Sequence, residues 1–362
     1  MSAAAIPSSP RSAERLTPDD EVAAKLSVSR EAVALVRSSE VIDLHLESYI
    51  PPRLWGYDLA RRHDRHWLGG RFFGHLDFPR ALDGGLTGGM WSIATNILRG
   101  PRGRRRALAA NVRGLRGALE SYEGIRVVRT FAEWERARQG GQHGAMIAVQ
   151  GGNALEGMED AGELDDIVRV TVMHLSSSTF GTTSSPARLG GRGGLTAAGK
   201  AFVERLDAAR IFVDLAHVDR KGFWDAVDAH DRTLPLIVTH TGVTGVKPHW
   251  RNIDDDQIRA VAESGGVVGV MFEPGFLRAK GMANDAAMVI AHLEHVIRVG
   301  GEDAAALGSD YDGFIIPPPD LRDGFAAYFR LVQLMLEASW SEGRIRKVLG
   351  GSFLRSFAAL RP

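Results

Sequence analysis

The chain has 362 residues, of which 44% are hydrophobic and 24% charged; this is typical of a folded protein and fits one large domain or two smaller ones. Lys and Arg balance Asp and Glu at 44 each, so no excess charge favours a nucleic acid or an anionic membrane as partner. The absence of cysteine excludes disulfides, thiolate metal ligands and cysteine nucleophiles. No window approaches a membrane span of about 20 apolar residues, and the start lacks the apolar core of a signal peptide. We therefore expect a cytoplasmic protein.

The beginning of the chain, "MSAAAIPSSPRSAERLTPDD", is rich in Ser, Pro and Ala and is predicted to be disordered. The pattern from about Pro18 to Arg37 predicts a helix. We interpret residues 1–35 as an N-terminal arm and residues 36–362 as a single domain.

Short apolar runs with β-branched residues recur through this domain, separated by helical patterns such as those at 195–210, 254–266 and 283–301. Apolar strands alternating with helices indicate a parallel sheet covered on both faces, and eight such strands fit a (β/α)₈ TIM barrel. A basic run at 99–117 lacks interleaved aromatic residues and predicts a solvated helix face rather than a nucleic-acid surface. The eight predicted strands are 41–46, 86–95, 145–150, 168–175, 211–218, 235–240, 266–272 and 304–310.

Polar side chains gather at the C-terminal ends of these predicted strands, the end at which barrel enzymes build their active sites. Taken singly, each fits a structural role, such as a hydrogen-bonded histidine or an aspartate that shapes a turn. Together they indicate a metal site, because unpaired polar groups are costly to bury. Imidazole and carboxylate suit Zn²⁺, which activates a bound water for attack, and a nearby carboxylate can transfer the proton. The residues are His45, Glu47, Gln150, His174, His217, His240 and Asp310.

The order and spacing of several motifs resemble the membrane dipeptidase (renal dipeptidase) family, metallopeptidases of the amidohydrolase superfamily. The resemblance covers nearly the whole chain after about residue 35. It rests on motifs that include "DLHLES", "AVQGGNAL", "VTVMHLSSS", "IFVDLAHV", "VTHTGV" and "LGSDYDGF". It implies a (β/α)₈ barrel of the metallo-dependent hydrolase type with two zinc ions, which hydrolyses dipeptides and often tolerates a D-residue at the C-terminal position.

The resemblance also implies a role for each motif residue. His45 and Glu47 match the ligand pair of the first metal, and His217 and His240 match the histidines of the second. Gln150 stands at the position that bridges the two ions. Of the remaining three residues, Asp310 matches the catalytic acid/base, His174 a catalytic and substrate-binding group at the scissile carbonyl, and Arg251 the group that binds the substrate carboxylate.

Two positions depart from the family's pattern. The first motif is normally His-x-Asp, whereas His45-x-Glu47 carries one more methylene, a tolerable change. The bridging residue is normally Glu, and Gln150 offers one neutral oxygen in place of two anionic ones. Because two close divalent ions repel one another, loss of this negative charge is expected to weaken one metal site and leaves either one or two ions possible.

We expect a zinc-dependent dipeptidase that acts through a metal-activated hydroxide on a small dipeptide-like substrate, with neither nucleic acid nor membrane as partner. The family resemblance suggests a homodimer. Two alternatives remain open: a diverged member with an altered or single-metal site that acts on another small amide or carboxylate, and a catalytically inactive ligand-binding homologue.

Overall fold

The structure is a computed structural model that describes residues 18–63, 70–95, 99–157, 165–186 and 192–362. Eight parallel strands form a closed barrel in the order β1-β2-β4-β5-β6-β7-β8-β9, in which β9 pairs back to β1. A ninth strand, β3, pairs with the first residues of β4. The strands are β1 (Ile42–Leu46), β2 (Gly88–Ala94), β3 (Ile125–Val127), β4 (His143–Gln150), β5 (Ile167–Thr171), β6 (Phe212–Asp214), β7 (Ile237–Thr241), β8 (Val267–Val270) and β9 (Ala305–Leu307).

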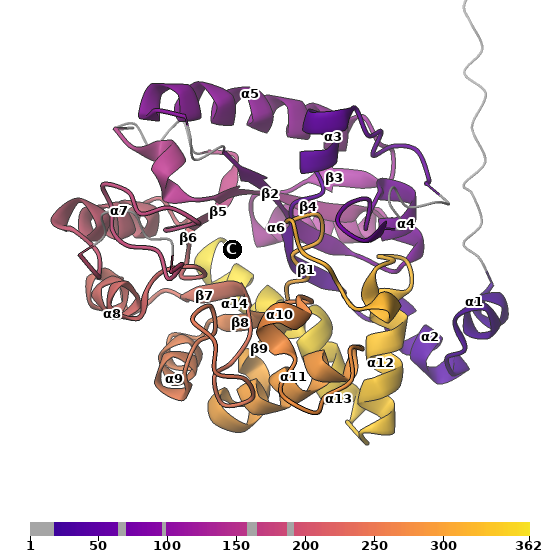
Figure 1. Cartoon of the computed structure of the whole chain (residues 1–362). Coiled ribbons are helices and arrows are strands. Elements are labelled where there is room, and N and C mark those ends of the chain that lie inside the picture. The colour runs from indigo at the N-terminus through magenta and orange to yellow at the C-terminus, as the bar shows by residue number, and fades with distance from the viewer. Residues whose placement is uncertain (1–17, 64–69, 96–98, 158–164, 187–191) are drawn as a thin grey trace, which may run out of the picture.

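Helices surround this ring of strands (Figure 1). Larger helices follow most strands and cover the outer face of the barrel, as the predicted alternation requires. They are α1 (Asp19–Leu26), α2 (Arg30–Arg37), α3 (Ile50–Trp55), α4 (Phe78–Asp83), α5 (Pro101–Glu120), α6 (Phe131–Gln139), α7 (Ala197–Ala208), α8 (Arg220–Ala229), α9 (Asp255–Glu263), α10 (Pro274–Leu277), α11 (Ala287–Gly300), α12 (Ala327–Glu337), α13 (Glu342–Arg346) and α14 (Ser352–Leu360), with short 3₁₀ turns at Gly152–Leu155, Glu302–Ala304 and Pro319–Leu321 and a π-helical turn at Lys347–Gly351.

One apolar cluster fills the inside of the barrel away from the predicted site. It takes at least one side chain from each of the eight barrel strands, for example Leu44 of β1 and Phe212 of β6. Phe353 and Phe357 of α14 belong to the same cluster, so the C-terminal helix packs against the barrel interior. Burial of these side chains excludes water from one end of the barrel and leaves the other end for polar groups.

The eight predicted barrel strands are confirmed at their predicted places, and β3 was not predicted. The predicted helices at 99–117, 195–210, 254–266 and 283–301 correspond to α5, α7, α9 and α11. The single helix predicted over 18–37 is wrong, because Ser27 adopts a left-handed conformation that ends α1 and the Ser29 side chain accepts from Ala32 N to begin α2. Residues 1–17, for which disorder was predicted, lie outside the described residues.

Long-range packing ties the two N-terminal helices to the barrel. In Figure 1 they lie at the edge of the molecule beside α12, and Ser29 N donates to Gln333 Oε1 of α12 at 2.8 Å.

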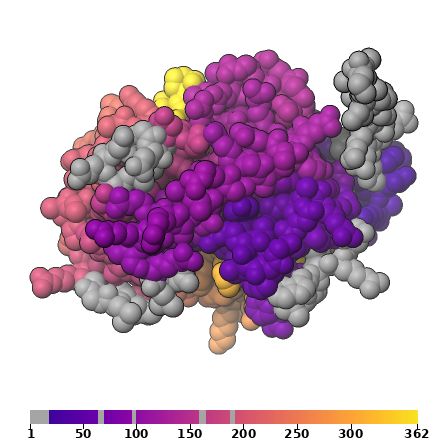
Figure 2. Space-filling model, turned by 90° about the horizontal axis from the view of Figure 1, so that it is seen from above, coloured from indigo at the N-terminus to yellow at the C-terminus, as the bar shows by residue number. Residues whose placement is uncertain are grey.

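Residues from the first half of the chain cover most of the face seen in Figure 2. Within the described residues, no helix combines the length and apolar character needed to cross a membrane.

Candidate active site

All eight residues predicted for the site lie at the C-terminal end of the barrel. His45 and His240 lie within β1 and β7, Gln150 ends β4, and the others follow strand ends in the chain. Six of them line one cavity of about 560 Å³, while the buried rings of His45 and His240 contact these lining residues from behind. The six lining residues are Glu47, Gln150, His174, His217, Arg251 and Asp310.

Unusual backbone conformations occur at two of these residues and directly beside a third. His217 and Asp310 both have a φ of 64°, in the left-handed region that non-glycine residues seldom adopt. Gly151, directly after Gln150, has a φ of 103°, and a Cβ there would lie 3.1 Å from His174 Cβ. Such backbone strain clusters at functional sites, where the surrounding fold over-determines the conformation.

One group of possible metal ligands comprises His217, His240 and Gln150. The Nε2 atoms of the two histidines lie 2.8 Å apart, and Gln150 Nε2 lies 3.3 and 3.4 Å from them. His240 Nδ1 lies 2.9 Å from Thr239 Oγ1, whose hydroxyl donates to Asp214 Oδ2 at 2.7 Å. Because a histidine that binds a metal normally donates its other ring N–H in this way, His240 fits a metal ligand.

The second group comprises His45, Glu47 and Asp310. His45 Nε2 lies 3.5 Å from Asp310 Oδ1 and 4.0 Å from Glu47 Oε1. His45 stacks on His240 with ring centroids 3.8 Å apart, so the two groups adjoin. His45, His240 and Asp310 each place one possible ligand atom within 4.8 Å of the others, an arrangement that could hold a metal ion.

A buried arginine that the sequence analysis missed lies directly beneath these groups. Arg169 of β5 is fully buried, and its Nη2 atom lies 2.8 Å from His45 Nδ1. Its Nη1 atom donates to Thr171 and to Asp214 Oδ2, the latter at 3.2 Å. A bulge turns Arg169 into the barrel: Ile147 and Ala148 of β4 pair with Ile167 and Arg169, so β5 advances two residues for one on β4. In a regular strand that begins at Val168, inward and outward side chains alternate, and this alternation does not predict that Arg169 points into the barrel.

Burial shifts the pKa values of the site toward neutral forms. It holds the pKa of His45, His217 and His240 well below the usual value, and nearby arginines add to the effect. The pKa of His174 is lowered to about 3 by burial and by Arg251. Burial raises the pKa of Asp310 well above its usual value, and the Glu47 charge adds to this rise. The histidines are therefore neutral at physiological pH, as a metal ligand must be.

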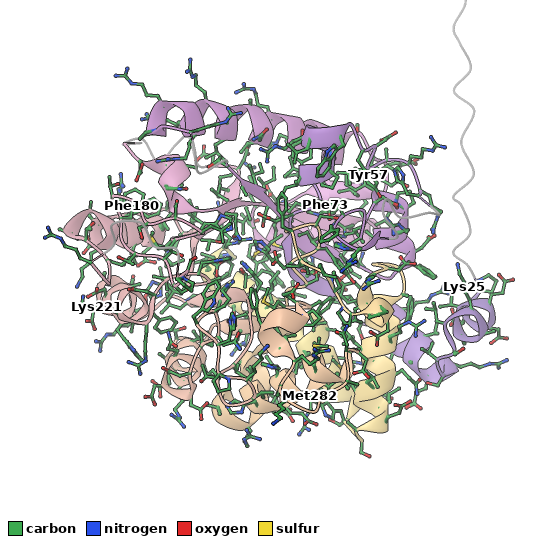
Figure 3. All side chains as sticks on the ribbon, in the orientation of Figure 1. Lys25, Tyr57, Phe73, Phe180, Lys221 and Met282 are labelled. Carbon is green, nitrogen blue, oxygen red and sulfur yellow. The ribbon has the colours of Figure 1, made fainter. Side chains whose placement is uncertain are left out.

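The cavity mouth is largely apolar. Several large apolar side chains gather around its opening. Phe314 packs edge-on against Phe73, with ring centroids 4.8 Å apart, and Phe73 is labelled near the centre of Figure 3. Arg251 is buried at the cavity wall, where its Nη2 atom donates to His240 O at 2.6 Å. The cavity lining thus combines two arginines, Arg53 and Arg251, with an apolar rim formed by Ile50, Leu54, Leu175, Trp250, Phe276, Phe314 and Ile315.

Comparison with known proteins identifies the family to which the chain belongs. The family model for membrane dipeptidase (peptidase family M19) matches residues 29–361. The chain belongs to the membrane dipeptidase family. The predicted family and barrel are thereby confirmed. A curated relative from Klebsiella pneumoniae, an uncharacterized protein in the pqqA 5' region, is 37% identical over 165 residues; the match spans 45% of this chain and 59% of that relative.

Two solved structures of this family share the fold. The crystal structure of the dipeptidase AC, a metallopeptidase of family M19, is 28% identical, with 89% of this chain and 99% of that chain covered at a TM-score of 0.75. A metallopeptidase from Rhodobacter sphaeroides, solved with a phosphinate mimic of the dipeptide L-Ala-D-Ala, is 26% identical, with 88% and 98% covered and the same TM-score. A probable dipeptidase, PvdM from Pseudomonas aeruginosa, is 16% identical at a TM-score of 0.75 and supports the fold alone.

Proposed function

We propose that this chain is a zinc-dependent dipeptidase. The observation that carries the proposal is the meeting, at one cavity, of a histidine pair with metal-ligand spacing, a buried carboxyl group and a buried arginine. His217, His240 and Gln150 would hold the ion. Two imidazole nitrogens on one tetrahedral zinc ion lie about 3.3 Å apart, slightly farther than the 2.8 Å between the Nε2 atoms. A bound zinc ion would polarise the scissile carbonyl and lower the pKa of water to about 7.

Arg251 is the proposed anchor of the substrate's C-terminal carboxylate. Its guanidinium lies at the cavity wall, and a planar fork of donors matches a carboxylate with two parallel hydrogen bonds. Burial lowers the pKa of Arg251 to about 10, so the group remains charged at neutral pH. This anchor would fix the distance from the carboxylate to the scissile bond, which favours dipeptides over longer peptides.

His174 and Asp310 are the proposed catalytic residues. His174 borders the cavity beside His217, with ring centroids 4.7 Å apart, and its neutral ring can donate an N–H bond to the carbonyl oxygen as negative charge develops there. Asp310 lines the same cavity and would accept a proton from the attacking water and pass it to the leaving amine. Burial raises the pKa of Asp310, whereas the nearby Arg251 charge lowers it and so favours the ionised form that can accept this proton.

A panel of L,L and L,D dipeptides, including L-Ala-D-Ala, tests the proposal by release of free amino acids. We expect hydrolysis by the zinc-loaded protein, none after chelation, and recovery when zinc returns. His240→Ala should lose both zinc and turnover. Hydrolysis that persists in the chelated protein would contradict the proposal.

Gln150 and Arg169 also favour a second candidate, a diverged member that acts on another small amide with a carboxylate. Both residues alter the charge around the first ligand pair, His45 and Glu47. The proposed substrate anchor and proton carrier, Arg251 and Asp310, are retained. Turnover of N-acyl amino acids with no turnover of any dipeptide would select this candidate.

A further inference from the structure

His45 and His240, which stack at the centre of the site, have different kinds of hydrogen-bond partner at Nδ1: one partner accepts and the other donates. For His240 the partner is the Thr239 oxygen, whose single proton goes to the Asp214 carboxylate. The oxygen can then only accept, so His240 Nδ1 carries the proton and Nε2 keeps its lone pair. This tautomer offers Nε2 to a metal ion.

For His45 the partner at Nδ1 is the Arg169 guanidinium, at 2.8 Å. A guanidinium has donors and no acceptor, so His45 Nδ1 must accept. The other neighbour, Ser92 Oγ at 3.3 Å, itself accepts from Arg169 Nη2, and its own proton can go to the ring or to Met90 O at 3.5 Å. The proton of the neutral His45 ring therefore lies on Nε2, the atom that faces Glu47 and Asp310.

This tautomer does not suit a metal ligand at the first position. Ligand histidines donate their second N–H to a carboxylate, carbonyl or water, whereas His45 receives a hydrogen bond from a permanent cation. Charge leads in the same direction. Gln150 lacks the negative charge of the family's glutamate, and the Arg169 guanidinium, which also pairs with Asp214 Oδ2 at 3.2 Å, lies against the ring that would hold the ion.

Gln150 fits a site for one ion. The Thr171 hydroxyl lies 2.9 Å from Gln150 Oε1 and 2.7 Å from Asp214 Oδ2, and it has one proton to donate. If that proton goes to the carboxylate, a half-turn of the amide lets its NH₂ donate to Thr171 instead. The amide oxygen then faces the Nε2 atoms of His217 and His240. Two histidines and one oxygen, with a fourth position open, form the usual ligand set of a catalytic zinc ion.

We propose that this protein binds one metal ion, at His217, His240 and Gln150, and that Arg169 takes the place of the ion at the first position. The inference rests on the proposed function and deepens it. His45 then remains a metal-free neighbour of Asp310, whose Oδ1 atom lies 3.5 Å from His45 Nε2. Arg169 supplies fixed positive charge beneath Glu47 and Asp310.

Zinc content per chain is the first test. The metal-free protein is incubated with excess Zn²⁺, desalted and measured by elemental analysis and by native mass spectrometry. We expect one equivalent. Two equivalents would overturn the single-ion inference and leave the proposed function standing, whereas none would overturn both.

Variants then separate Arg169 from Gln150. Gln150→Glu alone should still bind one ion, because Arg169 still donates to His45. Gln150→Glu with Arg169→Met should bind two, since His45 is free to change tautomer. The matched control, Gln150→Glu with Arg169→Lys, retains the positive charge and should bind one. Two ions in Gln150→Glu alone would show that Arg169 does not exclude the first ion.

Folding of the Arg169 variants can be checked independently. Asp214 retains hydrogen bonds from Thr171, Thr239 Oγ1, Thr239 N and Ala216 N when Arg169 is removed. Circular dichroism and thermal unfolding verify that each variant is folded. If the double variant fails to fold, electron paramagnetic resonance of the wild-type protein loaded with excess Co²⁺ decides the question: isolated high-spin Co²⁺ supports one ion, and a spin-coupled pair contradicts it.

Discussion

Arg251→Met gives a sharp prediction about substrate recognition. The side chain is buried at the cavity wall, and the variant removes both donors proposed to bind the substrate carboxylate. A hydrogen bond to a charged group contributes about 1.5–3 kcal/mol, and a tenfold change in rate corresponds to about 1.4 kcal/mol. We therefore expect kcat/KM to fall about 10- to 150-fold for each of these hydrogen bonds lost, mainly through a higher KM, because the contact is made in both ground and transition states.

A matched substrate separates this effect from damage to the site. A dipeptide with a C-terminal amide lacks the carboxylate, so the wild-type protein should hydrolyse it more slowly by a similar factor. The Arg251→Met variant should no longer distinguish the acid from the amide. Arg251→Lys, which keeps the charge but not the planar fork, should fall between the two.

Zinc content and thermal unfolding of both variants serve as controls, because Arg251 also donates to His240 O. A variant that retains zinc and still prefers the free acid as strongly as the wild type would refute the assignment of Arg251 as the carboxylate anchor.

Four further predictions concern catalysis, stability and specificity. Asp310→Asn should lower kcat about 10²- to 10⁴-fold with zinc content unchanged, and a variant with wild-type kcat would exclude Asp310 as the proton carrier. Burial lowers the pKa of His143 from 6.5 to about 4, so the unfolded chain binds more protons in this range and stability falls as pH decreases from 6.5 to 4. This lower pKa corresponds to about 3 kcal/mol, and the free energy of unfolding of His143→Gln, measured by denaturant titration, should lack this part of the decrease. Free zinc at about 1,000 times its dissociation constant should stabilise the metal-free protein by about 4 kcal/mol, seen in calorimetry as a higher Tm; an unchanged Tm would argue against a resident ion. Phe314→Ala should raise KM about tenfold for dipeptides with bulky apolar side chains and little for Ala-Ala, while Phe72→Ala, a partly exposed residue outside the cavity lining, should change neither.

The barrel could be predicted because its strands are apolar runs at regular intervals between helices. β3 was missed because Ile125–Val127 carries an exposed arginine in its middle and lies outside the closed ring, whereas the equally short β6 and β9 are buried along their whole length. The break between α1 and α2 was missed because it depends on the left-handed conformation of Ser27, which amphipathic periodicity does not encode.

The candidate site was predictable to the extent that its residues lie at strand ends. A histidine at the end of a barrel strand reaches the active-site mouth whatever its neighbours are, so His45 and His240 could be placed from the sequence. Arg169 could not, because it faces the barrel interior only through the bulge in β5. Its contact with His45 joins residues 124 apart in the chain, and a single sequence carries no signal for such a pairing.

Titration of the metal-free protein with zinc, followed by dipeptide hydrolysis, tests the central claim most directly. If a single ion at His217, His240 and Gln150 supports catalysis, activity will rise linearly and reach a plateau at one equivalent of zinc. A plateau at two equivalents would contradict the single-ion site, and no dipeptide hydrolysis at any zinc concentration would contradict the proposed peptidase activity itself.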